Sequence, residues 1–322
     1  MKLLYNPVFL NHDTGMHPEN KTRLQAFDHL PATNIRNGEE YIRLFHSDSY
    51  IEKVKKACQA SAHLDPDTIA SPGSFDAAIF AVGATVMASE TQDFALVRPP
   101  GHHAHQNHSS GFCIFNNIAI AVQKLVNEGK KVLIFDFDGH LGDGTEQYFY
   151  NSNNVFYWSL HQFPAFPGKG TVDEIGSGKG KGYTMNIPLP EGTGDDMYRE
   201  AILTFLPVAK AFQPDVVAVS AGFDGHQSDL LLSIKLSTSM YYEIGSLLRK
   251  NFSKIFATLE GGYNPKTLPH CVYNFIDGVN GTHERYKEAS TESTILVMEE
   301  CQNTFRKLKE NMTPYWKVLS NK

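Results

Sequence analysis

Histidines gather in one short stretch of this chain, residues 98–111, which read RPPGHHAHQNHSSG. The stretch holds four of the fourteen histidines, namely His102, His103, His105 and His108. Neighbouring imidazoles make one another harder to protonate, so a cluster of this kind is costly without a purpose. Three interpretations are open at this point: a metal-binding tract, an acid–base pair, or a solvated loop.

The stretch DFDGHLGDG, residues 136–144, carries the strongest local signal for metal binding. Alternation along a strand places Asp136 and Asp138 on the same face, with His140 just beyond the strand end. Asp138 and His140 are then two convergent ligands, and Asp224 of the GFDGH motif, on a separate strand, can supply a third. Two carboxylates and one imidazole suit zinc, and three protein ligands leave one position open for water or substrate.

One metal ion fits this pattern better than two. A binuclear manganese site of the arginase type needs an Asp-x-His-x-Asp run, whose last carboxylate bridges the second ion. This chain has Gly142 at that last position, and His226 stands where a further carboxylate after Asp224 would be needed. The sequence therefore predicts a single catalytic metal.

Short runs that are apolar on both faces recur along the chain and alternate with helical patterns, such as residues 116–129. The expected strands are residues 93–97, 131–138, 154–161, 215–224 and 254–263. An expected C-terminal helix has one apolar stripe, formed by Met298, Cys301, Phe305 and Leu308. Such alternation indicates a parallel sheet covered by helices. We predict an α/β fold in three layers (αβα) with a central, mostly parallel sheet, in a single domain over residues 1–322.

Polar residues with useful chemistry stand at the carboxyl ends of these expected strands. The first strand leads into RPPGHH, the second ends in Asp136 and Asp138, the fourth ends in Asp224, and the fifth leads into Gly-Gly-Tyr263. In open α/β sheets, ligands bind beyond the carboxyl ends of the strands. The motifs therefore predict one shared site.

Composition limits the classes of partner. The 322 residues are 41% hydrophobic, and 29 basic against 35 acidic residues give a formal net charge of −6. This balance, without a basic stripe interleaved with aromatics, argues against a nucleic-acid partner. The N-terminal segment has only short apolar runs and predicts neither a signal peptide nor a membrane span. Four cysteines without CxxC spacing predict reduced, buried thiols in a cytoplasmic protein, which we expect to be a monomer or a weak oligomer.

The motifs also occur together in an order that resembles a known family. Besides those quoted above, they are HDTGMHPENKTRL (12–24), SPGSFDAA (71–78), GFCIFNN (111–117), SLH (159–161), FPGKG (166–170), SAGFDGH (220–226) and LEGGYNP (259–265). Through them the chain resembles the zinc-dependent histone deacetylases and deacetylase-like amidohydrolases, closest to the class II-like bacterial members. The resemblance implies the arginase/deacetylase fold. The family usually has a second histidine where this chain has Leu141, which is not a metal-ligand position, so we expect tuning of the site rather than its loss.

The resemblance answers the question that the histidines raise. It implies that His102 and His103 are a tandem catalytic pair, whose ring nitrogens bond the carboxylates of Asp136 and Asp143. His103 would remove a proton from water and return it to the departing amine, while His102 gives electrostatic support. Tyr263 would donate its hydroxyl to the tetrahedral oxyanion.

The resemblance further implies a narrow substrate channel. Its expected residues are Gly111, Phe112, Phe166 and Leu231. Either Asp65 or Asp67, on the loop before Ser71, would hold the backbone amides of the substrate at the rim. His105 and His108 match nothing catalytic in the family, and we expect them to be ordinary loop residues.

Two kinds of metal ion are implied. One catalytic Zn²⁺ would bind Asp138, His140 and Asp224. A structural K⁺ would bind a second, overlapping set, which is Asp136, Asp138, His140, Ser159 and Leu160.

The predicted activity is zinc-dependent hydrolysis of the amide of acetyl-lysine, or of another acyl-lysine, in proteins or peptides, which releases acetate and free lysine. The alternative is an amidohydrolase of small acetylated amines such as acetylpolyamines. A non-catalytic acyl-lysine binder is disfavoured, because the ligands, the histidine pair and Tyr263 are intact. Leu231, seven positions after Asp224, favours peptide substrates, since a glutamate there accompanies polyamine preference in the family.

Overall fold

The centre of the molecule is a sheet of seven strands, counted over residues 1–320, which the computed structural model describes. The strands are β1 (Leu3–Leu4), β2 (Phe94–Ala95), β3 (Val132–Asp136), β4 (Val155–Gln162), β5 (Thr184–Leu189), β6 (Val216–Ala221) and β7 (Ile255–Leu259). They pair in the order β1-β2-β7-β6-β3-β4-β5, and every pair is parallel. The predicted fold class is confirmed, and the expected strand runs correspond to β2, β3, β4, β6 and β7.

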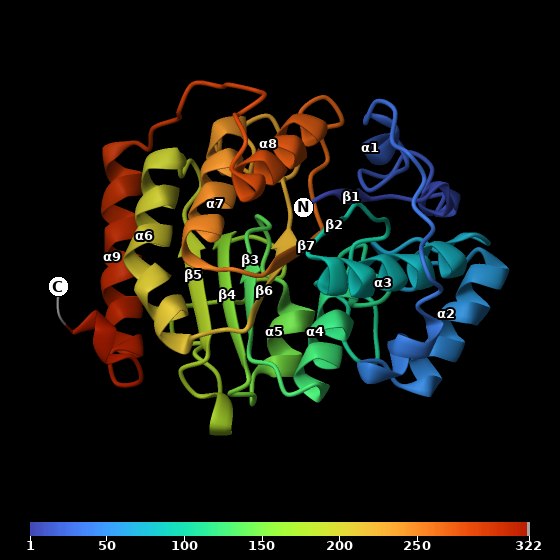
Figure 1. The fold of residues 1–322 in the computed structure, drawn as a ribbon, viewed down its shortest axis with the longest axis horizontal. Helices are drawn as coiled ribbons and strands as arrows, with labels where there is room; N and C mark the ends of the chain where they lie inside the picture. The colour runs from blue at the N-terminus through green and yellow to red at the C-terminus, as the bar shows by residue number, and fades with distance from the viewer. Residues whose placement is uncertain (321–322) are drawn as a thin grey trace.

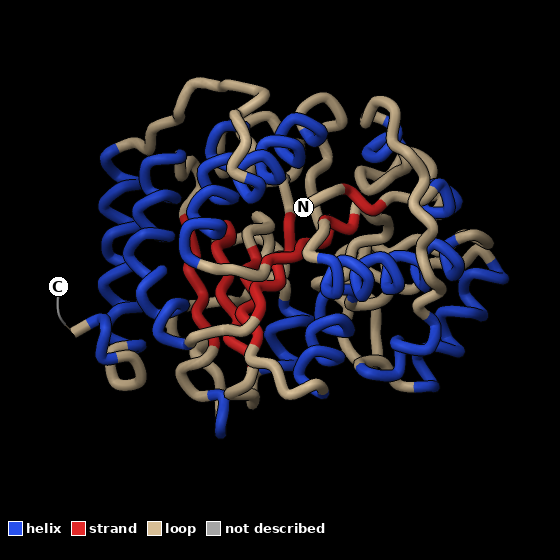
Figure 2. Tube along the Cα trace, viewed as in Figure 1, coloured by secondary structure: helices blue, strands red, loops and turns tan. Residues whose placement is uncertain are grey.

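Helices cover both faces of this sheet, as Figures 1 and 2 show. The α-helices are α1 (Thr22–Gln25), α2 (Asp48–Ala60), α3 (Ser74–Thr91), α4 (Asn117–Asn127), α5 (Asp143–Phe149), α6 (Asp195–Phe212), α7 (Thr238–Asn251), α8 (Leu268–Asn280) and α9 (Ile295–Met312). Short 3-10 helices are η1 (Pro7–Asn11), η2 (Glu39–Leu44), η3 (Gly178–Gly180) and η4 (Lys317–Leu319). In one layer α3 packs on β7 and α4 packs on β6 and β3, whereas in the other α9 packs on β5, and α6 lies beside α9.

The core follows from strands that are apolar on both faces. All residues of β3 and β4 are buried, and the buried apolar side chains form one continuous cluster. The predicted stripe of α9 contributes Cys301, Phe305 and Leu308 as buried residues, with Met298 packed against the cluster. The sequence pattern missed β1, which has two residues, and β5, which contains Pro188. Because β5 lies at the edge of the sheet, its proline is tolerated there.

The order of the strands in the sheet determines where the site lies. On one side of β3 lie β4 and β5, and on its other side lie β6 and β7, so the topology reverses between β3 and β6. Ligands of open α/β sheets bind at the carboxyl ends of the strands at such a reversal. Asp138 and His140 follow β3, and Asp224 follows β6, so the predicted zinc ligands come from the two strands at this point.

A side-chain cap joins α4 to the histidine loop. Oδ1 of Asn116 accepts a hydrogen bond from the backbone N–H of Ala119 at 3.0 Å, which satisfies a free donor of the first helical turn. Nδ2 of Asn116 donates to the carbonyl of Ala104, also at 3.0 Å. The start of a buried helix therefore fixes the segment that carries His102 and His103.

A buried ion network joins the N-terminal segment to the loop after β7. Glu19 is fully buried and accepts hydrogen bonds from Arg98 at 2.7 Å and from Arg23 at 3.0 Å. Burial alone would raise the pKa of Glu19, but the charge and hydrogen bonds of Arg98 and His12 together outweigh burial and hold that pKa well below its usual value. Arg23 also donates to the carbonyl of Gly262 at 2.7 Å, and its guanidinium lies 4.9 Å from the ring centroid of Tyr263.

Glu19→Gln is expected to lower the free energy of unfolding by about 3–5 kcal/mol, because it leaves buried guanidinium groups without their counter-charge. Denaturant titration followed by circular dichroism measures this change. The control is Glu90→Gln, which removes a partly exposed pair with Arg36, where an ion pair contributes at most about 1 kcal/mol. A Glu19→Gln protein as stable as this control would contradict the role assigned to the network.

Candidate active site

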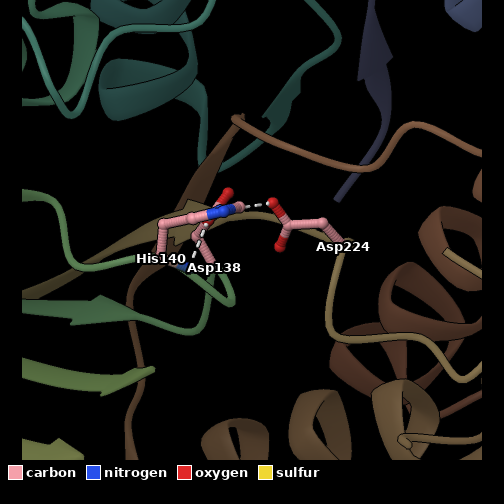
Figure 3. Close-up of side chains that lie close together, drawn as sticks. All are labelled: Asp138, His140 and Asp224. Carbon is pink, nitrogen blue, oxygen red and sulfur yellow. Dashed lines mark hydrogen bonds and ion pairs between the residues drawn. The ribbon is translucent and has the colours of Figure 1, made fainter. Parts of the chain in front are cut away.

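The side chains of the three predicted zinc ligands converge, as Figure 3 shows, on the segments that follow β3 and β6. The possible ligand atoms of Asp138, His140 and Asp224 all lie within 4.8 Å of one another. Nδ1 of His140 is 2.9 Å from Oδ2 of Asp224 and 3.3 Å from Oδ1 of Asp138. Both carboxylates are buried, and they come from segments more than eighty residues apart in the sequence.

The other oxygen of each carboxylate is held by the backbone. The N–H of Gly261 donates to Oδ2 of Asp138, and the N–H of Gly139 donates to Oδ1 of Asp224, both at 2.7 Å. Outer donors of this kind orient the ligands of a metal. A Cβ at Gly222 would lie 1.9 Å from Oδ2 of Asp138, so no side chain fits beside this carboxylate. Two adjacent buried carboxylates and one convergent imidazole nitrogen form a donor set that zinc accepts.

The tandem histidines, His102 and His103, lie side by side, and the centroids of their rings are 4.1 Å apart. Nδ1 of His102 is 3.2 Å from Oδ2 of Asp136, and Nδ1 of His103 is 2.9 Å from Oδ1 of Asp143. An ionised carboxylate only accepts hydrogen bonds, so each Nδ1 carries the proton and donates it. The structure thus brings together both predicted imidazole–carboxylate pairs, and Nε2 of each ring faces away from its carboxylate partner.

The surroundings drive the pKa values of the two histidines apart. Burial lowers the pKa of His102, but the carboxylates of Asp138 and Asp136 outweigh burial and raise this pKa well above its usual value. Burial and the adjacent charge of His102 lower the pKa of His103 to about 4. At neutral pH, His103 is therefore neutral and able to accept a proton, whereas His102 carries a charge.

A cavity of about 540 Å³ leads from the surface to these groups, within the usual range of ligand pockets. Its lining includes the predicted channel residues Gly111, Phe112, Phe166 and Leu231. His103, His140 and Tyr263 line the same cavity. Gln162 and Leu232 also line it, and the sequence predicted neither, because neither belongs to a motif of charged or histidine residues.

Aromatic edges shape the walls of this cavity. The ring of Phe112 meets the ring of Tyr263 edge-on at 5.7 Å between centroids, and Phe166 meets His103 in the same way at 5.0 Å. Gly111 has a φ of +51°, and a Cβ there would lie 2.5 Å from the ring of His103. A side chain at position 111 would therefore displace either the histidine or the wall.

Tyr263 lies on the loop after β7 with only 6% of its surface exposed. Burial raises the pKa of its hydroxyl well above the usual value, so the group remains a hydrogen-bond donor. The backbone N–H of Tyr263 donates to Oδ2 of Asp229 at 2.6 Å, and Oδ1 of Asp229 accepts from the N–H of Leu231 at 3.2 Å. Asp229, which no sequence motif singled out, therefore ties the tyrosine loop to the leucine at the cavity.

The sequence did not decide whether Asp65 or Asp67 lies at the rim of the channel, and the two have different surroundings in the structure. Asp67 lines the cavity, whereas Asp65 accepts a hydrogen bond from the hydroxyl of Ser109 at 2.5 Å. Leu141, the departure from the family pattern, is fully buried and belongs to the hydrophobic core. Of the predicted potassium ligands, Asp136 lies in register with Ser159 where β3 pairs with β4, and Leu160 follows Ser159.

One expectation about the histidine cluster is wrong. His105 is not an ordinary loop residue, because its side chain is buried and its Nε2 lies 3.1 Å from Oδ2 of Asp143. His108 is exposed and stacks on His105, with ring centroids 4.2 Å apart. Residues 101–104 form a turn in which the N–H of Ala104 donates to the carbonyl of Gly101, so the spacing of the two histidines did not predict this contact.

Comparison with known proteins identifies the family of this chain. A family model described as the histone deacetylase domain matches residues 17–279. The chain belongs to the histone deacetylase family. It is 33% identical to a probable deacetylase of Archaeoglobus fulgidus, over 98% of this chain and 99% of that protein, and 35% identical to a probable deacetylase of Methanothermobacter thermautotrophicus, over 87% and 91%. The crystal structure of the HDA15 HD domain superposes with a TM-score of 0.89 at 29% identity, over 99% of this chain and 98% of that one.

Membership of the histone deacetylase family indicates a hydrolase with deacetylase activity. The arginase/deacetylase fold that the resemblance implied is likewise confirmed by the match to the HDA15 domain. Among residues 1–320, none of the helices is long and apolar enough to cross a membrane.

Proposed function

We propose that this histone deacetylase family member hydrolyses the side-chain amide of acetyl-lysine, or of another acyl-lysine, in proteins or peptides. One observation carries the proposal. A single cavity with phenylalanine walls is lined by a neutral histidine, His103, by a residue of the convergent metal-ligand set, His140, and by a buried phenol, Tyr263. These are the groups that metal-assisted amide hydrolysis requires.

The donor set of Asp138, His140 and Asp224 would hold one Zn²⁺. When bound, zinc supplies a Lewis acid that polarises the substrate carbonyl and lowers the pKa of water. Asp136, Ser159 and their neighbours would hold the structural K⁺, which the strand register supports by setting these two residues side by side.

Three side chains, His103, His102 and Tyr263, carry out the remaining steps of the reaction. Nε2 of His103 accepts a proton from the attacking water and later delivers it to the departing lysine amine, while Asp143 fixes the ring through Nδ1. His102, charged and bonded to Asp136, stabilises the negative charge that develops nearby. The hydroxyl of Tyr263 donates to the oxyanion of the tetrahedral intermediate.

The cavity lining supports a lysine side chain as the substrate. Phe112 and Phe166 offer apolar walls to the four methylene groups, which lose their contact with water on binding. Asp67 is the rim carboxylate that could accept the backbone N–H groups of a peptide outside the cavity. A cytoplasmic location stays a prediction, and the buried state of all four cysteines accords with it.

Leu231→Glu is expected to move the preference from acetyl-lysine peptide toward acetylspermidine, because a carboxylate at the cavity would attract the second ammonium of a polyamine. The measurement is kcat/KM for both substrates on the native and variant proteins. Leu230→Glu is the matched control, since Leu230 is exposed next to Leu231 and is not part of the cavity lining. A native protein that favours acetylspermidine would overturn the peptide assignment.

The activity itself is tested with a panel of acyl-lysine peptides and acetylpolyamines, with and without a zinc chelator. We expect hydrolysis of acyl-lysine peptides that is lost with the chelator and restored by added zinc. Turnover that persists after complete removal of metal, or no turnover of any acylated amine by the zinc-loaded protein, would contradict the proposal.

A further inference from the structure

The carboxylate of Asp143 is shared between two imidazoles. Its Oδ1 is 2.9 Å from Nδ1 of His103, and its Oδ2 is 3.1 Å from Nε2 of His105. Because the carboxylate only accepts hydrogen bonds, both histidines donate to it. The side chains of His105 and Asp143 are 8% and 7% exposed, so this contact is formed largely out of water.

A second contact fixes the ring of His105. Its Nδ1 lies 2.5 Å from Oε1 of Gln147, which stands one helical turn after Asp143 on α5. His105 therefore bridges two side chains that lie one turn apart on α5, and it contacts the Asp143 oxygen that His103 does not use.

The carboxylate behind the other catalytic histidine has comparable support. Asp136 bonds His102 through Oδ2, and the same oxygen accepts a hydrogen bond from the hydroxyl of Tyr157 at 2.9 Å. Each histidine of the tandem pair thus has a carboxylate partner, and each carboxylate has a second side-chain donor. In the pair that includes His103, this donor is His105.

We propose that His105 is a positioning residue for the general base, and that it acts on His103 through Asp143. The inference rests on the proposed function for the role of His103, but the contact it describes is a property of the folded chain. Without His105, Oδ2 of Asp143 loses its side-chain donor next to a cavity of about 570 Å³ that His105 and Gln147 help to line. The carboxylate is then free to rotate toward that cavity, and the ring of His103 loses its fixed orientation.

His105→Ala is expected to lower kcat about 10- to 100-fold, the usual effect of removing such an outer partner, with KM for an acyl-lysine peptide little changed. His105→Gln should recover most of the loss, because its terminal amide can place an N–H where Nε2 of the imidazole stands. Gln106→Ala is the control, since Gln106 is exposed in the same loop. Native kcat in His105→Ala, or equal losses in the alanine and glutamine variants, would overturn the proposal.

A spectroscopic measurement separates this inference from the proposed function. In the zinc-loaded protein, the low-field proton resonance of Nδ1–H of His103, identified by its loss in His103→Ala, reports the bond to Asp143. We expect this resonance to shift or broaden in His105→Ala and to be retained in His105→Gln and Gln106→Ala. An unchanged resonance in His105→Ala would overturn the inference, whereas a native protein that hydrolyses no acyl-lysine would overturn only the proposed function.

Discussion

Tyr263→Phe is expected to lose about 100- to 1000-fold in kcat on an acyl-lysine peptide, the usual cost of removing one oxyanion donor. The substitution deletes only the hydroxyl. The ring contacts with Phe112 and the Arg23 guanidinium, and the backbone bond to Asp229, all remain available to phenylalanine. KM, zinc content and thermal stability should therefore stay close to native values.

The measurement is steady-state kinetics with a metal assay on the same preparations. Tyr315→Phe provides the control, because Tyr315 is an exposed tyrosine on the segment after α9. If Tyr263→Phe turned over at nearly the native rate, the hydroxyl would have no part in the reaction, and Tyr263 would serve only to pack the cavity wall.

Asp224→Ala is expected to abolish both bound zinc and hydrolysis. The change removes one of two carboxylates from the three-residue donor set and leaves His140 with Asp138 alone. Two protein ligands are fewer than the three that catalytic zinc sites use. Asp224 also accepts a hydrogen bond from the backbone N–H of Gly139, so the substitution changes the stability of the fold independently of its effect on zinc.

Elemental analysis of the purified proteins measures the metal, and the peptide assay measures turnover. We expect one zinc ion per native chain, none in Asp224→Ala, and native values in Asp28→Ala, which removes an exposed carboxylate. Circular dichroism establishes that the Asp224→Ala chain is folded. Two tightly held ions per native chain, or full activity of the variant, would rule out the single-zinc mechanism.

The sequence by itself predicted the types of group in the site, because these are encoded locally. Asp138 and His140 are two positions apart at the end of an apolar run, and this spacing alone predicts a pair of convergent ligands. The runs that form β3, β4 and β6 are apolar on both faces, which predicts buried parallel strands. The fold class followed from the same alternation of strands and helices.

Two strands at the edges of the sheet could not be predicted from the sequence, for physical reasons. β1 has two residues, too few for any period to be visible, and β5 contains Asn186 and Pro188, which are unfavourable in most strands. Both are strands because they extend an existing sheet at its two edges. Pairing with a neighbour, rather than their own sequence, determines their conformation.

The sequence predicted that Asp224 joins Asp138 and His140, and the tertiary structure supplies the reason. Asp224 reaches His140 because β6 pairs with β3 rather than with β5, which precedes it in the sequence. The contact of His105 with Asp143, and the choice of Asp67 over Asp65 at the cavity, likewise depend on how loops lie against α5 and against one another. Local propensities carry no information about such partners, since the free energy of these contacts arises from groups that approach only after the sheet and its helices have packed.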